Sequence, residues 1–235
     1  TPDGWDSREL LEPSKDDGTR SFDDEGDVGV LRTWRAMCPE LQERWPEAAR
    51  PEHWEGVTME NGRVVQLKLE EFGLTGAVPA EIGRLSALRE LDLDGNELTS
   101  VPAEIGQLTS LEKLYLGDNQ LTSLPAEIGQ LTSLRELDVD NNQLTSLPAQ
   151  IGQLASLKVL GLGGNQLTSL PAEFGQLRSL THLALCDNQL TSVPVEFWQL
   201  TELRALWLHD NMLTSLSAEI RQLSSLEMLD VHDNP

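Results

Sequence analysis

A repeated frame of apolar residues governs most of this 235-residue chain. From Val64 onward, leucine or valine recurs in the pattern L-x-x-L-x-L-x-x-N-x-L, with a first step of 24 residues and six further steps of 23. The frames begin at Val64, Leu88, Leu111, Leu134, Leu157, Leu180, Leu203 and Leu226. A single unit of this size cannot bury its own apolar face, whereas a stack of units buries them all. The sequence therefore predicts a solenoid of seven complete repeats and a truncated eighth.

The unit that starts at Leu134 indicates how one repeat folds. Its first part, "LRELDV", alternates apolar and polar residues, which predicts a short strand with Leu137 and Val139 inward and the acidic residues on the open face. The second part, "LTSLPAQIGQL", returns along the outer face, and Pro148 suits a short helical or extended start because it needs no backbone donor. Stacked units place these strands in one parallel sheet, so the predicted fold class is α/β.

An asparagine ends the strand of almost every unit. Its amide can satisfy backbone groups that a buried bend would leave unpaired, so stacked copies should form a ladder. The residues in this position are Asn96, Asn119, Asn142, Asn165, Asn188, Asn211 and Asn234. Phe72 occupies the first such position, where no earlier rung is present to bond.

These motifs resemble the plant-type leucine-rich repeat proteins. The first unit, "LTGAVPAEIGRL", is similar to the 24-residue repeat of plant receptor ectodomains, and later units such as "LTSLPAEIGQL" are similar to the intracellular plant Ras-group-related class. The resemblance implies a curved right-handed coil. It places a parallel sheet on the concave face and short helical, 3-10 or extended segments on the convex face.

The resemblance also implies three parts along the chain. Residues 1–26 are acidic and rich in Pro, Gly and Ser, and we expect an extended or disordered lead-in. Residues 27–63 resemble the plant amino-terminal cap, with a helix over 27–38 and a small hairpin within 53–67. Residues 64–235 form the solenoid, whose truncated end we expect further chain or a partner to cover. Receptor caps carry a cysteine pair where this chain has Glu52 and Met59, which argues against a disulfide-closed extracellular cap.

Charge and cysteine content narrow the classes of partner and compartment. The formal net charge of −22 disfavours nucleic acid and anionic membrane surfaces, and favours a protein partner of basic or mixed charge. The sequence holds no apolar run long enough for membrane insertion. Its two cysteines, Cys38 and Cys186, fall in different units, so a disulfide framework is not expected. These features lean towards an intracellular location, cytoplasmic or organellar.

The predicted concave face is polarised. Its first half is acidic and its second half combines small residues with one large aromatic, Trp207, which is how an interface anchor is often built. We predict that a partner presents basic residues to the acids and an apolar contact to Trp207. The alternative is that the acids only solubilise the face and that Trp207 packs flat against its neighbours. The predicted contact residues are Asp92, Asp94, Tyr115, Asp138, Asp140, Trp207, His209 and Met228.

Two further features raise the question of a second site. Cys186, His209 and His232 occupy one column, and zinc or copper accepts such ligands. Three adjacent rungs form a nearly straight line, however, so we interpret them as variable surface positions and expect no metal and no other cofactor. Trp198 replaces a turn glycine and is a candidate for a convex contact, with drift of the repeat as the alternative.

Catalytic signatures are absent from the sequence. It contains no Gly-x-Ser-x-Gly, Walker-type loop, kinase motif or His-Glu-x-x-His. The acid pairs lie on an open face, where we expect nothing to raise a carboxyl pKa. The sequence therefore predicts a non-enzymatic protein-interaction module. The alternatives are a ligand-sensing domain of a larger receptor or signalling enzyme, and a structural subunit of a large assembly.

Overall fold

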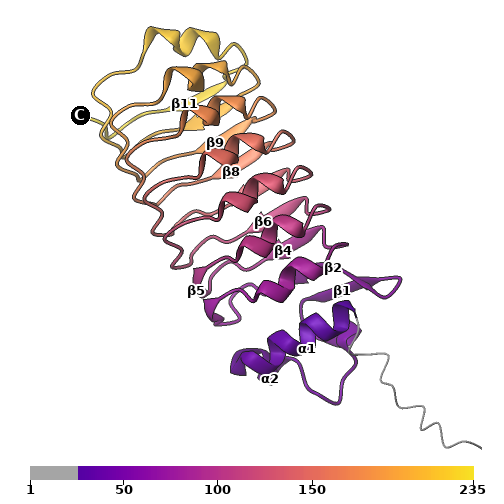
Figure 1. Cartoon of the computed structure of the whole chain (residues 1–235). Coiled ribbons are helices and arrows are strands. Elements are labelled where there is room, and N and C mark those ends of the chain that lie inside the picture. The colour runs from indigo at the N-terminus through magenta and orange to yellow at the C-terminus, as the bar shows by residue number, and fades with distance from the viewer. Residues whose placement is uncertain (1–25) are drawn as a thin grey trace, which may run out of the picture.

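The computed structural model describes residues 26–235, which form a curved solenoid behind a small amino-terminal cap (Figure 1). Residues 1–25 of the expected lead-in lie outside the described residues. The α-helices are α1 (Asp27–Met37) and α2 (Pro39–Arg44). The strands are β1 (Val57–Glu60), β2 (Arg63–Lys68), β3 (Thr75–Ala77), β4 (Glu90–Asp92), β5 (Glu97–Ser100), β6 (Lys113–Tyr115), β7 (Glu136–Asp138), β8 (Val159–Gly161), β9 (His182–Ala184), β10 (Ala205–Trp207) and β11 (Met228–Asp230).

The concave face is a nine-stranded sheet in the order β1-β2-β4-β6-β7-β8-β9-β10-β11. The hairpin partner β1 runs antiparallel to β2, and the remaining neighbours are parallel. Strands β3 and β5 form a separate two-stranded sheet that the sequence did not predict. The parallel sheet of the predicted solenoid is confirmed.

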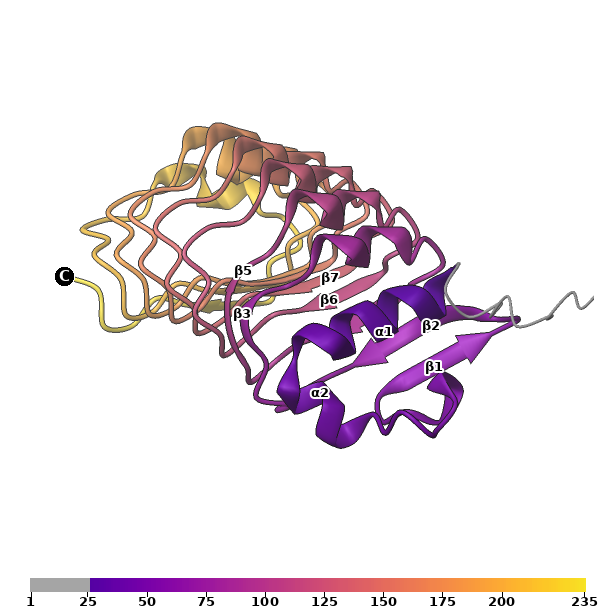
Figure 2. The ribbon, with the colours of Figure 1, turned by 60° about the horizontal axis from the view of Figure 1, so that its bottom comes forward.

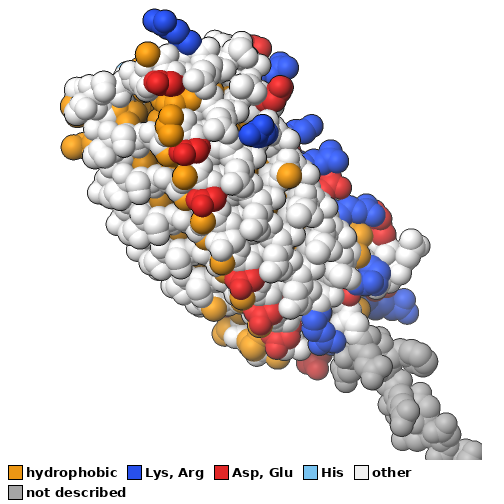
Figure 3. Space-filling model, turned by 45° about the horizontal axis from the view of Figure 1, so that its top comes forward, with side chains coloured by type: hydrophobic (Ala, Val, Ile, Leu, Met, Phe, Trp, Pro, Cys, Tyr) orange, Lys and Arg blue, Asp and Glu red, His pale blue; other side chains and the backbone are white. Residues whose placement is uncertain are grey.

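Short 3-10 helices, one per repeat, lie across from the sheet (Figure 2). A proline precedes most of them in extended conformation, in keeping with the expected short start. They are η2 (Ala80–Arg84), η3 (Ala103–Gln107), η4 (Ala126–Gln130), η5 (Ala149–Gln153), η6 (Ala172–Gln176), η7 (Val195–Gln199) and η8 (Ala218–Gln222), after a cap turn η1 (Pro51–His53). Acidic side chains form a spaced row over this outer face (Figure 3).

Leucine side chains from both faces fill the space between strands and 3-10 helices. In one repeat, Leu137, Val139, Leu144 and Ile151 are all at most 1% exposed. Each buried leucine side chain stabilises the fold by about 2 kcal/mol, and its neighbours above and below provide most of that burial.

The asparagine ladder is confirmed in detail. Oδ1 of Asn142 accepts a hydrogen bond from the Leu121 N–H of the preceding repeat at 2.9 Å. Its Nδ2 donates to the carbonyl oxygens of Leu116, Val139 and Asp140 at 2.9–3.1 Å. Each rung therefore joins two repeats and satisfies backbone groups that have no access to water.

The residue just before each ladder asparagine turns the chain in the left-handed region. Asp187, Asp210 and Asp233 have φ of 53°, 53° and 51°. Asn and Asp tolerate this conformation because their short polar side chains bond locally. These aspartates are therefore ordinary turn residues of the repeat.

The cap closes the amino-terminal end of the core. Asp27 of α1 is buried, where its carboxylate accepts hydrogen bonds from Arg63 Nε at 3.0 Å and from Val64 N–H at 2.8 Å. The indoles of Trp45 and Trp54 stack at 5.0 Å. The expected helix and hairpin are present, and α2 is an addition that the sequence did not predict. None of the helices between residues 26 and 235 is long and apolar enough to cross a membrane.

Candidate interaction surface

The concave face carries rows of outward side chains, each with one residue per strand. Strand pairing sets Asp138 of β7 beside Gly161 of β8 and Ala184 of β9. The middle row reads Lys68, Asp92, Tyr115, Asp138, Gly161, Ala184, Trp207 and Asp230. The other predicted contact residues flank this row: Asp94, Asp140, His209 and Met228. The structure therefore brings all of them onto one face.

Two aspartates of the acidic half are tied to the backbone of the following repeat. Asp94 accepts a hydrogen bond from Gly117 N–H at 2.6 Å, and Asp140 accepts one from Gly163 N–H at 2.5 Å. Burial, with the nearby Asp138 charge, raises the pKa of both carboxyls from 3.8 to about 6. The expectation that nothing here raises a carboxyl pKa was therefore wrong, because neighbouring repeats cover these side chains.

Protonation of these two aspartates should stabilise the fold. Since their pKa is higher in the folded than in the unfolded chain, their ionisation weakens the fold as the pH rises from about 4 to about 6. We expect the melting temperature to rise when the pH falls from 7 to 5, and Asp140→Asn to flatten that rise. Asp187→Asn removes one exposed turn charge and is the control. Equal slopes for Asp140→Asn and the wild type would contradict the assignment.

Two lysines form ion pairs that neutralise part of the negative charge of the acidic half. Lys68 pairs with Glu90 at 2.8 Å, and Lys113 pairs with Glu136 at 3.2 Å. The Tyr115 hydroxyl donates to Glu136 at 2.5 Å, and burial together with this bond raises the pKa of Tyr115 to about 12. The hydroxyl is therefore already engaged, so Tyr115 offers a partner mainly its ring.

A shallow hollow of about 160 Å³ lies in the middle of the face. Gly161 and Ala184 form its floor. Trp207 stands on one side, on the strand next to that of Ala184, and Tyr115 stands on the other side, beyond Asp138 of β7. Trp207 is half-buried, so part of its indole packs on the sheet and part remains open. The small residues beside Trp207 leave the hollow open on the side of the indole.

Two large apolar side chains extend this surface. Val159 borders the hollow and is 41% exposed, and Met228 opens β11 and is 51% exposed. Exposed apolar groups that lie on one face with an aromatic side chain favour burial by a partner.

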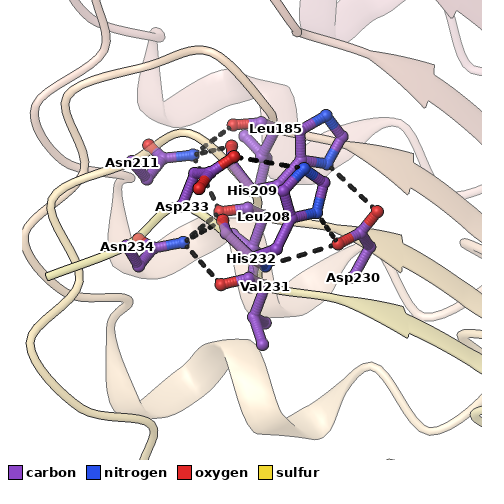
Figure 4. A network of polar contacts seen from close by, with 9 residues as sticks. All are labelled: Leu185, Leu208, His209, Asn211, Asp230, Val231, His232, Asp233 and Asn234. Carbon is purple, nitrogen blue, oxygen red and sulfur yellow. Dashed lines mark hydrogen bonds and ion pairs between the residues drawn. The ribbon is translucent and has the colours of Figure 1, made fainter.

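The column of Cys186, His209 and His232 is not a single cluster. The two imidazoles stack with their centroids 4.6 Å apart, and Cys186 groups with His209 but is not grouped with His232. Burial, followed by the charge of Asp187, raises the pKa of the Cys186 thiol to about 11, which makes this thiol a poor metal ligand. Sequence reasoning missed Asp230, which lies beside both imidazoles (Figure 4).

The predicted convex contact at Trp198 is wrong. Its side chain is only 2% exposed and meets the ring of Phe197 edge-on at 5.3 Å. The equivalent residue one repeat earlier, Gly175, shows why, since a Cβ there would meet the backbone of Glu196 in the next repeat. This position faces the following repeat, so an indole here enters the core.

Comparison with known proteins identifies the repeats. A family model described as a leucine-rich repeat region matches residues 135–232, and another described as leucine rich repeat matches residues 86–144. Over 61 residues the chain is 43% identical to the leucine-rich repeat receptor protein kinase EMS1 of Arabidopsis thaliana. That match covers 25% of this chain and 5% of the kinase.

Solved structures of repeat proteins share the architecture. A leucine-rich repeat protein of Leptospira interrogans is 42% identical with a TM-score of 0.54, over 69% of this chain and 47% of that one. The ectodomain of the Arabidopsis receptor kinase HAESA, solved with an IDA peptide hormone ligand, is 28% identical with a TM-score of 0.70, over 88% of this chain and 41% of that one. This chain therefore spans less than half the length of each of these proteins.

Proposed function

Because this chain belongs to the leucine-rich repeat family and resembles its plant-type members, we propose that it is a non-enzymatic module that binds a protein partner through its concave face. The observation that carries the proposal is the hollow between Tyr115 and Trp207, which lies beside the aspartates of the acidic half. A receptor ectodomain with the same architecture holds a peptide ligand. The domains of this family are generally interaction modules.

The chemistry of the face indicates the partner. Asp92 and Asp138 lie in the middle row, and the net charge of the chain is −22, so a basic or mixed-charge segment would be attracted to this half. An apolar side chain next to that basic segment would fill the hollow beside Trp207. Such an arrangement places the apolar contact at the centre and the charges at the edge, as in many protein interfaces.

Substitutions on the face test this proposal. The native complex would first be isolated with the wild-type chain and its partner identified by mass spectrometry, and binding would then be measured by calorimetry. We expect Trp207→Ala to weaken binding about 30-fold, the loss typical of an aromatic anchor. Asp138→Lys should slow association most strongly at low salt, because it reverses a charge that attracts the partner.

Glu127→Lys is the matched control. Glu127 lies on η4 of the outer face, so its charge reversal leaves the concave face unchanged. Wild-type binding by Trp207→Ala and Asp138→Lys would overturn the proposal, as would an equal loss of binding in Glu127→Lys.

A second candidate is a ligand-sensing domain within a longer receptor or signalling enzyme. The likeness to the HAESA ectodomain, of which this chain covers 41%, favours it. A full-length transcript that encodes a kinase, GTPase or membrane-spanning segment would support this candidate.

For the compartment we propose an intracellular location, since Cys38 and Cys186 are both free thiols. Cell fractionation with a specific antibody tests that location.

A further inference from the structure

Three side chains at the carboxyl-terminal end of the concave face direct ligand atoms towards one another. They are His209, Asp230 and His232, and one ligand atom from each lies within 4.8 Å of the others. Nδ1 of His232 is 2.5 Å from Oδ1 of Asp230, and Nδ1 of His209 is 3.5 Å from Oδ2. The carboxylate thus lies beside both imidazoles (Figure 4).

Nδ1 of His209 is an unsatisfied polar atom. It is buried, and no other group among the described residues forms a hydrogen bond with it. Asp230 is within ion-pair distance at 3.5 Å, but that contact does not have the geometry of a hydrogen bond. Because buried polar atoms are nearly always paired, this nitrogen lacks a partner that a cation could supply.

The two imidazoles share one carboxylate, that of Asp230. Nδ1 of His232 forms a hydrogen bond with Oδ1 of Asp230, and its Nε2 lies 3.6 Å from Asp233. Protonation of both stacked rings would instead place two positive charges about 4.6 Å apart. One divalent cation, in place of the proton between His232 and Asp230, would contact all three groups without that repulsion.

We propose that His209, Asp230 and His232 bind a divalent transition-metal ion, with Zn²⁺ as the probe that best suits two imidazoles and one carboxylate. Tetrahedral zinc separates its ligand atoms by about 3.3 Å, close to the spacing of His209 and Asp230. The rings are now nearly parallel, at 7°, so binding requires a rotation about Cβ–Cγ, a soft torsion for histidine. The exposed side of His232 leaves a fourth position for water.

Asp230 distinguishes this site from the nearly straight column of Cys186, His209 and His232 that the sequence indicated. It belongs to the middle row, whereas His209 and His232 belong to the next row, so the three ligands form a triangle. Two other groups share these histidines: Cys186 and Asp187 with His209, and Asp210 and Asp233 with His232. Each of them has only one imidazole, so Zn²⁺ has less reason to prefer it.

Calorimetry with ZnCl₂ on the full chain without a histidine tag tests the proposal. The chain has four histidines, so His53 and His182 serve as matched controls. We expect one Zn²⁺ per chain, and His209→Asn, His232→Asn and Asp230→Asn each to weaken binding at least about tenfold. His53→Asn, His182→Asn and Cys186→Ser should leave the affinity unchanged, and Mg²⁺ should not compete.

The opposite results would overturn the site. They are the absence of saturable Zn²⁺ binding, an equal loss in the His53 or His182 variants, or a loss on Cys186→Ser that matches the loss on His232→Asn. A Co²⁺ spectrum provides a second readout, since a sulfur-to-metal band would assign the ion to Cys186. Binding of the protein partner does not enter this test, so failure here leaves the proposed function untouched.

Discussion

Replacement of Asn142 by alanine is expected to lower the free energy of unfolding by about 3 kcal/mol. The variant loses four hydrogen bonds of one side chain, from the Leu121 N–H and to three carbonyl oxygens. These backbone groups lie between two repeats, where the ladder asparagine is only 7% exposed and water has little access. Urea denaturation followed by circular dichroism measures the loss.

The last rung provides a control of the same chemistry. Asn234 accepts from the Leu213 N–H and donates to the carbonyls of Leu208, Val231 and His232, but it is only half-buried. Water can replace its side chain, so Asn234→Ala should lose less than half as much as Asn142→Ala. Equal losses would show that burial does not decide the strength of the ladder.

The sequence predicted the solenoid because its core depends on residues that repeat in one frame. A leucine such as Leu137 points inward in each unit for the same local reason, the period of two along a strand. The ladder asparagine, such as Asn142, has the same structural role in every repeat, so its hydrogen bonds could be predicted from the sequence alone. The rows of the open face follow from the same register, which is why the predicted contact residues, from Asp92 to Met228, lie on one face.

The candidate site was less predictable because it depends on contacts between repeats. The raised pKa of Asp140 comes from burial beside Gly163, a residue 23 positions later. Asp230 contacts His209 of the preceding repeat. The two residues belong to different rows of the face, so the column of histidines alone does not indicate this contact. The prediction that Trp198 lies on the convex surface was wrong for a similar reason. Its position in the repeat faces the next repeat, and only the stacked structure shows how closely that repeat approaches.

The second large loss of stability is expected at Gly175 of η6, because the stacked repeats lie very close together there. A Cβ on this residue would lie 2.2 Å from the carbonyl oxygen of Glu196 and 2.6 Å from its carbonyl carbon. Both atoms belong to the backbone of η7, so they cannot rotate away and the two repeats must separate. We expect Gly175→Ala to lower the free energy of unfolding by about 3 kcal/mol, at the upper end of the usual cost of overpacking. Urea denaturation measures this loss.

Gly117→Ala is the control, because it adds the same methyl group on the concave face. Its Cβ would lie 3.3 Å from Oδ1 of Asp94 and 3.4 Å from Oδ1 of Asp138, side-chain atoms that need to move by only a few tenths of an ångström. Loss of glycine also reduces the freedom of the unfolded chain, so this variant should change stability by less than about 1 kcal/mol. Equal losses at Gly117 and Gly175 would mean that the backbone contact between repeats is not what requires glycine.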